Sequence, residues 1–117
     1  MAIPSTITYN DAGNVRTIMI TGRLDIGGND SVATKLVDLS EAPGKSVVVD
    51  LSTLSFLASI GIRAIIAAAK SVTARGNKMA LVVDAGSTVM MSIKATGVDQ
   101  LVPVFDNPSA AQKAALA

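Results

Sequence analysis

Two valine-rich apolar runs, each followed by a segment with helical periodicity, constrain the fold of this chain more than any other feature. "SVVVDL" at 46–51 and "KMALVV" at 78–83 are nearly continuous in apolar residues, which is typical of strands that are covered on both faces of a sheet. The segments that follow, 59–75 and 87–97, carry apolar residues at spacings of three and four. Because parallel strands need crossovers of this kind, the alternation predicts an α/β fold with a mostly parallel sheet.

The remaining segments complete the predicted fold. "TITY" and "VRTIMIT" flank the turn residues "NDAGN" and predict an N-terminal hairpin. A helix follows, with Asn29 or Asp30 as its N-cap. "LVPVF" predicts a last strand, placed at the sheet edge by Pro103, and a final helix begins at Pro108. We therefore expect a single domain over residues 1–117, with five strands in one mixed sheet and about four helices.

Composition excludes several classes of function. The chain has no cysteine and no histidine, which rules out cysteine-based metal sites, thiolate nucleophiles and a Ser-His-Asp triad. A net charge of +1 provides no basic stripe for nucleic acid, and the richest apolar stretch is too short for membrane insertion. No signal peptide is apparent. We therefore expect a cytoplasmic protein that is not an enzyme and has no metal or cofactor.

The tripeptide "GKS" at 44–46 is part of the phosphate-loop motif, but its surroundings do not fit. Leu39 stands where that motif requires a glycine, and a strand-like run follows where a helix is needed. The sequence therefore predicts no phosphate loop.

The stretch "FLASIGIR" at 56–63 places one hydroxyl, Ser59, where a buried strand turns into a helix. Local physics allows two interpretations. Serine is a preferred N-cap residue, so Ser59 caps the helix; alternatively, the helix N-terminus favours a phosphate on the hydroxyl. Gly61 would then allow a close backbone approach. Since Ile60 and Ile62 lie about 200° apart on a helix, we expect Ile62 to face the sheet and Ile60 to face a partner.

Three further residues are expected to have structural roles. Asp50, at the end of its strand, should accept N–H bonds from the following loop. Met90 and Met91 should divide between core and surface, which would make Met91 an adaptable contact near the partner surface.

The stretch "DLSTLSFLASIGIRAIIAAAK" resembles the signature of the STAS domain, which is found in sulfate transporters and anti-sigma factor antagonists. Bacterial antagonists carry Asp-x-Ser at the end of the third strand and Phe-x-Asp-Ser-Ser/Thr-Gly-Leu at the start of the helix. "GRLD" at 22–25 and "IKATGVDQLVPVF" at 93–105 resemble two further segments of the family. The resemblance covers nearly the whole chain in matching order and implies the strand and helix order predicted above.

The resemblance implies a mechanism called partner switching. An unphosphorylated antagonist binds an anti-sigma factor that is also a serine kinase, and the sigma factor is set free. Phosphorylation of the first serine in the motif breaks the complex, and a serine phosphatase restores it. By position, that serine is Ser59, and the family's aspartate after the second strand is Asp25. The implied partner-binding residues are Asp25, Ala58, Ser59, Ile60, Gly61 and Arg63.

Two positions depart from the family motif and leave alternatives open. Ala58 stands where antagonists usually have aspartate, and Ile60 replaces the second hydroxyl residue. The missing carboxylate removes a contact to the Ser59 hydroxyl and also like-charge repulsion against a phosphoserine. An apolar pair at these positions would favour constitutive binding, as in an unphosphorylated scaffold of a stress-sensing complex or a lipid-transport system. Nucleotide binding or hydrolysis is a third alternative, and the oligomeric state is left open.

Overall fold

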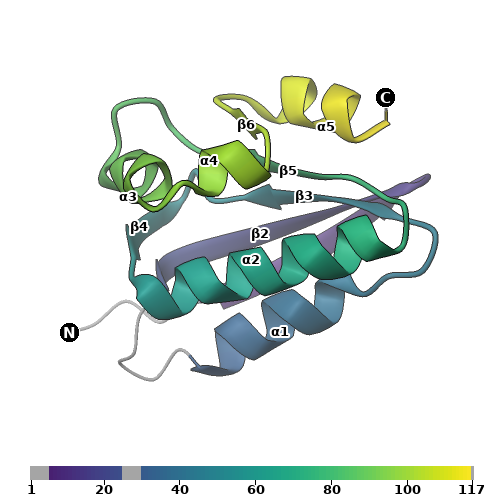
Figure 1. Cartoon of the computed structure of the whole chain (residues 1–117), viewed down its shortest axis with the longest axis horizontal. Coiled ribbons are helices and arrows are strands. Elements are labelled where there is room, and N and C mark those ends of the chain that lie inside the picture. The colour runs from purple at the N-terminus through teal and green to yellow at the C-terminus, as the bar shows by residue number, and fades with distance from the viewer. Residues whose placement is uncertain (1–5, 25–29, 117) are drawn as a thin grey trace.

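The computed structural model describes residues 6–24 and 30–116, which form a mixed sheet with helices on both faces (Figure 1). The strands are β1 (Thr6–Ala12), β2 (Val15–Leu24), β3 (Ser46–Asp50), β4 (Leu54–Leu57), β5 (Met79–Val82) and β6 (Val104–Phe105). The helices are α1 (Asp30–Ser40), α2 (Ser59–Ala74), α3 (Thr88–Thr96), α4 (Val98–Leu101) and α5 (Pro108–Leu116). The predicted α/β class is confirmed.

The strand order is β1-β2-β3-β5-β6, and β4 pairs separately with β2. The hairpin of β1 and β2 is antiparallel as predicted, and every other described pair is parallel. The last strand lies at the sheet edge, also as predicted, where the carbonyl of Pro103 accepts the Leu81 N–H at 2.9 Å. Proline can occupy this position because an edge strand does not need every N–H.

Two short elements depart from the prediction. β4 lies in the stretch that was expected to connect the third strand directly to the second helix. Its burial does not alternate, since Leu54 and Leu57 are buried and the two residues between them are exposed, so the period-2 signal of a strand is missing. Leu101 was expected in the last strand, but it is the last residue of α4. The observed strand β6 is shorter than predicted and covers Val104–Phe105. The predicted N-cap of α1, at Asn29 or Asp30, falls outside the described side chains.

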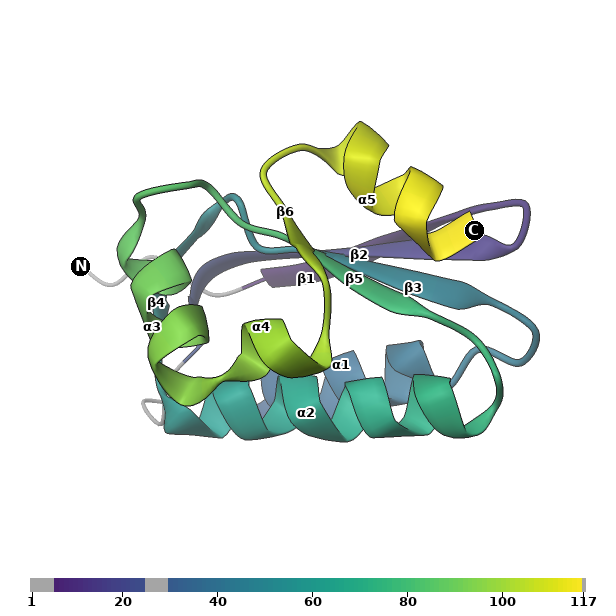
Figure 2. The same ribbon diagram turned by 45° about the horizontal axis from the view of Figure 1, so that its top comes forward.

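The valine run of β3 is buried because both faces of the sheet are covered. α1 and α2 lie on one face and α5 on the other (Figure 2). Val47 and Val49 belong to the same core cluster as Ile65 of α2, whereas Val48 packs with Ala111 of α5. Alternate valines thus pack into the core clusters on opposite faces of the sheet, which is why every position of the run is apolar.

Arg75, which directly follows α2, connects the end of that helix to the loop after α1. Its Nη2 donates to the carbonyls of Ser40 and Ala42, both at 3.0 Å, and of Lys45 at 3.4 Å. The chain then turns through Gly76, whose φ of +81° is in the left-handed region that glycine adopts without strain. The predicted end of the second helix at this glycine is confirmed.

An ion pair lies in the hairpin, where Arg16 Nε is 2.7 Å from Asp11 Oδ1. The hydrogen bond from Arg16 lowers the pKa of Asp11, and the same bond raises the pKa of Arg16. Figure 1 places the hairpin turn at the end of the molecule opposite the start of α2. Among the described helices, none is both long enough and apolar enough to cross a membrane.

Candidate functional site

Ser59 is the first residue of α2, and its side chain is exposed. The N-cap is Ala58, with φ −97° and ψ 175° and no side-chain cap bond. Its carbonyl accepts the N–H of Ile62 at 3.1 Å, so the helix begins one residue earlier than a Ser59 cap requires. The interpretation of Ser59 as the helix cap is therefore wrong. Within the described chain, its hydroxyl forms no hydrogen bond.

The segment before Ser59 is held in place by a series of side-chain hydrogen bonds. Asp50 is buried, and its Oδ1 accepts the Ser52 N–H at 2.9 Å and the Ser52 hydroxyl at 2.6 Å, which confirms its predicted role. Thr53 Oγ1 donates to the carbonyl of Ile20, and Ser55 Oγ donates to that of Gly22 at 2.8 Å. These bonds fasten the β3–β4 turn and β4 to β2. The start of α2 therefore follows a fixed strand rather than a free loop.

The other predicted site residues are placed as follows. Ile62 is 7% exposed and belongs to the core, as predicted, whereas Ile60 is half-buried. Gly61 is buried and Arg63 is exposed. Asp25 lies outside the described residues, although the residue before it, Leu24, pairs with Leu57 of β4. The roles of these residues in partner binding stay predictions.

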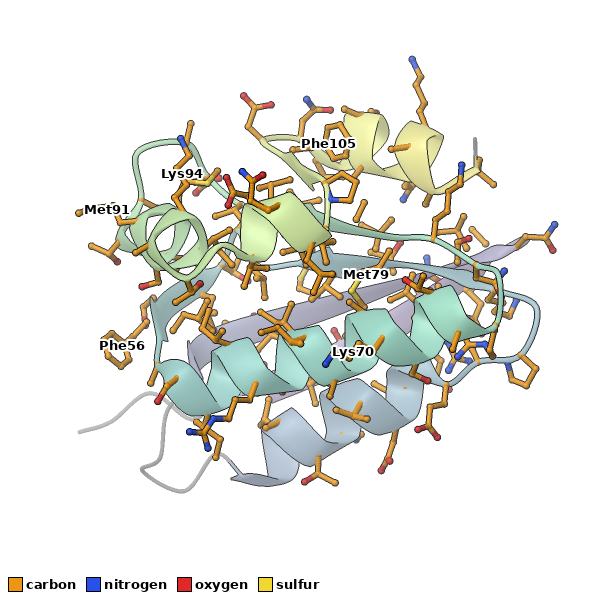
Figure 3. All side chains as sticks on the ribbon, in the orientation of Figure 1. Phe56, Lys70, Met79, Met91, Lys94 and Phe105 are labelled. Carbon is orange, nitrogen blue, oxygen red and sulfur yellow. The ribbon has the colours of Figure 1, made fainter. Side chains whose placement is uncertain are left out.

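Sequence reasoning did not select Phe56, which is 40% exposed on β4. Met91 on α3 is 67% exposed and Met90 packs against the core, so the predicted division of the two methionines is confirmed. α3 packs against β4, and Figure 3 shows Phe56 and Met91 projecting from the end of the molecule where α2 starts. Only 3% of the chain is aromatic, so a phenylalanine three residues before Ser59 was the signal that the sequence offered; its exposure is visible only in the structure. We call Phe56, Ser59, Ile60, Arg63 and Met91 the candidate partner surface.

The two helices of this surface, α2 and α3, carry positive charge. The sequences of α2 and α3 contain Arg63, Lys70 and Lys94 and no acidic residue, and all three cations are exposed. Among the described residues, there is no cluster of three or more His, Cys, Asp or Glu side chains that could hold a metal ion. An exposed hydroxyl beside apolar and basic side chains can accept a phosphoryl group and can contact a protein with an acidic and apolar surface.

The sequence model of the STAS domain matches residues 6–111. The chain belongs to the STAS domain family. No curated protein sequence matches this STAS domain.

Solved structures with the same fold include anti-sigma factor antagonists from two bacteria. One, from Mycobacterium paratuberculosis, is 20% identical with a TM-score of 0.87, over 100% of both chains. The other, a putative antagonist from Thermotoga maritima, is 22% identical with a TM-score of 0.81, over 95% of both chains. The unphosphorylated form of the antagonist SpoIIAA is 14% identical with a TM-score of 0.73, over 93% of this chain and 96% of that one. At these identities the likeness shows the fold.

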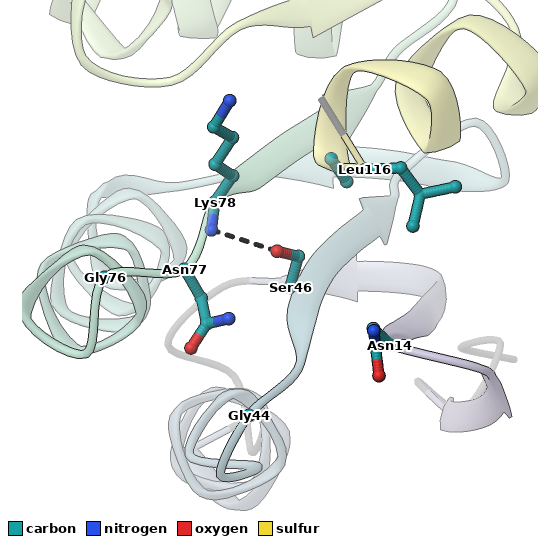
Figure 4. Close-up of a pocket in the computed structure, with 8 residues that line it drawn as sticks. Asn14, Gly44, Ser46, Gly76, Asn77, Lys78 and Leu116 are labelled. Atoms are coloured by element: carbon teal, nitrogen blue, oxygen red, sulfur yellow. Dashed lines mark hydrogen bonds between the residues drawn. The ribbon is translucent and has the colours of Figure 1, made fainter.

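A hollow of about 210 Å³ is lined in part by Gly44 and Ser46 of the "GKS" segment of this STAS domain, at the end of the sheet where β3 and β5 begin (Figure 4). Ser46 is the first residue of β3, and its Oγ accepts the backbone N–H of Lys78 at 3.1 Å. The segment thus leads into a strand, as the sequence predicted. The hollow is smaller than the roughly 300–1,000 Å³ of typical small-molecule sites, so it does not support the nucleotide-binding alternative.

Ala58→Asp is expected to raise the free energy of unfolding by about 1 kcal/mol, and the melting temperature by about 4 °C. The backbone of Ala58 already has the extended conformation of an N-cap, and a carboxylate there can accept an N–H of the first turn. Thermal and urea denaturation measure the gain. Ala74→Asp, at the C-terminal end of the same helix, is the control and should give none, because the helix dipole is unfavourable for an anion there. A loss of stability in both variants would contradict the assignment of Ala58 as N-cap.

Proposed function

We propose that this STAS domain is an anti-sigma factor antagonist, a regulatory binding protein rather than an enzyme. In the cytoplasm it binds an anti-sigma factor of the serine-kinase type, and phosphorylation of Ser59 ends the complex. The observation that carries the proposal is the exposed hydroxyl of Ser59 at the first residue of α2, which bonds to no described residue and lies next to Ile60. The matching fold of known antagonists, one of them described in an unphosphorylated form, supports it.

The expected effect of the phosphate follows from its charge and position. A phosphoserine carries between about −1.5 and −2 charges at neutral pH, and the helix N-terminus stabilises that charge through the first-turn N–H groups. The modified domain should therefore stay folded. A partner that packs on Ile60 would have to desolvate the phosphate, which is unfavourable without a matching cation. Phosphorylation should therefore release the partner. A serine phosphatase that removes the phosphate would restore binding.

Phosphoryl transfer to Ser59 is tested by incubating the domain with ATP and each anti-sigma factor kinase of the same genome. We expect stoichiometric labelling that mass spectrometry maps to Ser59 and that Ser59→Ala abolishes. Ser55→Ala is the matched control: Ser55 is a nearby exposed serine, but its hydroxyl is bonded to the Gly22 carbonyl. Labelling should persist in that variant. Isothermal titration of the modified domain should show an affinity at least about tenfold lower, or ~1.4 kcal/mol.

Two results would count against the proposal. Labelling that survives Ser59→Ala would place the phosphoacceptor elsewhere. Tight binding without any labelling would favour the scaffold alternative, in which the domain belongs to a larger assembly and is not modified.

A further inference from the structure

Ser59, Arg63 and Lys70 form a line along the outer side of α2. All three are exposed, and at 100° per residue they lie within about 40° of one another around the helix. The opposite side of α2 carries its buried residues, including Ile65, Ala68 and Val72. Figure 3 shows Lys70 on the outer side of the helix, away from the sheet. We call Ser59, Arg63 and Lys70 the α2 stripe.

The two cations of the α2 stripe are uncompensated. Within the described chain neither Arg63 nor Lys70 forms a side-chain hydrogen bond or an ion pair. Two other arginines with described side chains are paired: Arg16 with Asp11, and Arg75 with carbonyls of the loop after α1. No acidic residue occurs in α2 itself. The stripe therefore presents two exposed cations that form no ion pair within the described chain.

We propose that the partner lays an acidic segment along α2, with carboxylates placed against Arg63 and Lys70. The two positions are two helical turns, or about 10 Å, apart, so carboxylates seven residues apart on a partner helix would match both. Complementary charge steers such an encounter and fixes its register. Two cations are too few to hold a nucleic-acid backbone with useful affinity. This inference rests on the proposed function and specifies the partner's chemistry.

The same arrangement explains how Ser59 would control binding. Ser59 precedes Arg63 by one helical turn, so a phosphate there adds nearly two negative charges to the line that receives the acidic segment. Attraction between the two proteins would be replaced by repulsion at one end of the contact. The unphosphorylated stripe is therefore the binding form, and its charge is the feature that phosphorylation changes.

The first test uses the unphosphorylated domain and the anti-sigma factor identified by the labelling experiment, without ATP. The double variant Arg63→Glu, Lys70→Glu should bind at least about tenfold more weakly in about 50 mM salt, with the difference reduced in about 500 mM salt. Lys113→Glu is the matched control, because Lys113 is an exposed lysine on α5, on the other face of the sheet. It should change the affinity by less than about twofold. Binding of the double variant at parental affinity in low salt would overturn the inference and leave the proposed function intact.

A second test does not need an anti-sigma factor. It decides the inference even where no anti-sigma factor binds, a result that would contradict the proposed function. The probe is a helical peptide with two glutamates seven residues apart, titrated into the isotopically labelled domain and followed by NMR. The amide signals of 63–70 should shift with this peptide. They should not shift with the matching glutamine peptide or in the double variant. Absence of any shift on α2, or equal shifts with both peptides, would overturn the inference.

Discussion

Replacing Arg75 with methionine is expected to lower the free energy of unfolding of this STAS domain by about 3 kcal/mol. Its guanidinium donates to the backbone carbonyls of Ser40, Ala42 and Lys45. Ser40 is 0% and Ala42 is 6% exposed, so their carbonyls would lose a charged donor in a region that water reaches poorly. Leaving buried acceptors unsatisfied is more costly than losing an exposed hydrogen bond.

One feature limits the size of this loss. Arg75 Nε is buried and has no hydrogen-bond partner, so methionine also removes an unsatisfied donor while keeping a flexible apolar stem. Urea denaturation followed by circular dichroism measures the change, since the chain has no tryptophan to serve as a fluorescent probe. Arg63→Met is the matched control, because Arg63 is an exposed arginine of α2, the helix that Arg75 directly follows. It should alter the free energy of unfolding by no more than about 0.5 kcal/mol. Equal effects in both variants would show that Arg75 does not hold the loop.

Ile60→Asp is expected to weaken binding of the anti-sigma factor by at least about 100-fold while the fold remains intact. Ile60 is half-buried in the free domain and lies beside Ser59. An aspartate there would be desolvated by the partner, and pairing with Arg63, three residues along the helix, would occupy a cation of the α2 stripe; both effects oppose binding. The fold should tolerate the change, because an anion in the first turn of α2 interacts favourably with the helix dipole and offsets the lost partial burial.

The control for Ile60→Asp is Ser109→Asp. Ser109 is the second residue of α5, as Ile60 is of α2, and it is exposed. The two variants introduce the same charge at the same helix position on different sides of the molecule. Titration calorimetry should show unchanged affinity for Ser109→Asp, and melting curves of both variants should lie close to that of the parent. A collapse of the fold with Ile60→Asp would show that Ile60 belongs to the core.

The sequence by itself determined the class of fold and most of its elements. The runs "SVVVDL" and "KMALVV" became the buried strands β3 and β5, and the helical period of 59–75 became α2. These signals are readable because a strand covered on both faces and a helix covered on one each impose a pattern on consecutive residues. Gly76 and Gly97, with φ of +81° and +78°, ended their helices as predicted, since a left-handed C-terminal residue is a local requirement.

Only the tertiary structure decided how the surface around Ser59 is built. β4 pairs with β2 through Gly22, Arg23 and Leu24. These residues lie about thirty positions earlier in the sequence, so no local pattern predicted the strand. That pairing exposes Phe56, and the helix that follows begins with Ala58 rather than Ser59 as its N-cap. Local propensity favours serine as the cap. The outcome was different because the end of β4 sets where the chain can leave the sheet, and that position depends on contacts between segments far apart in the sequence.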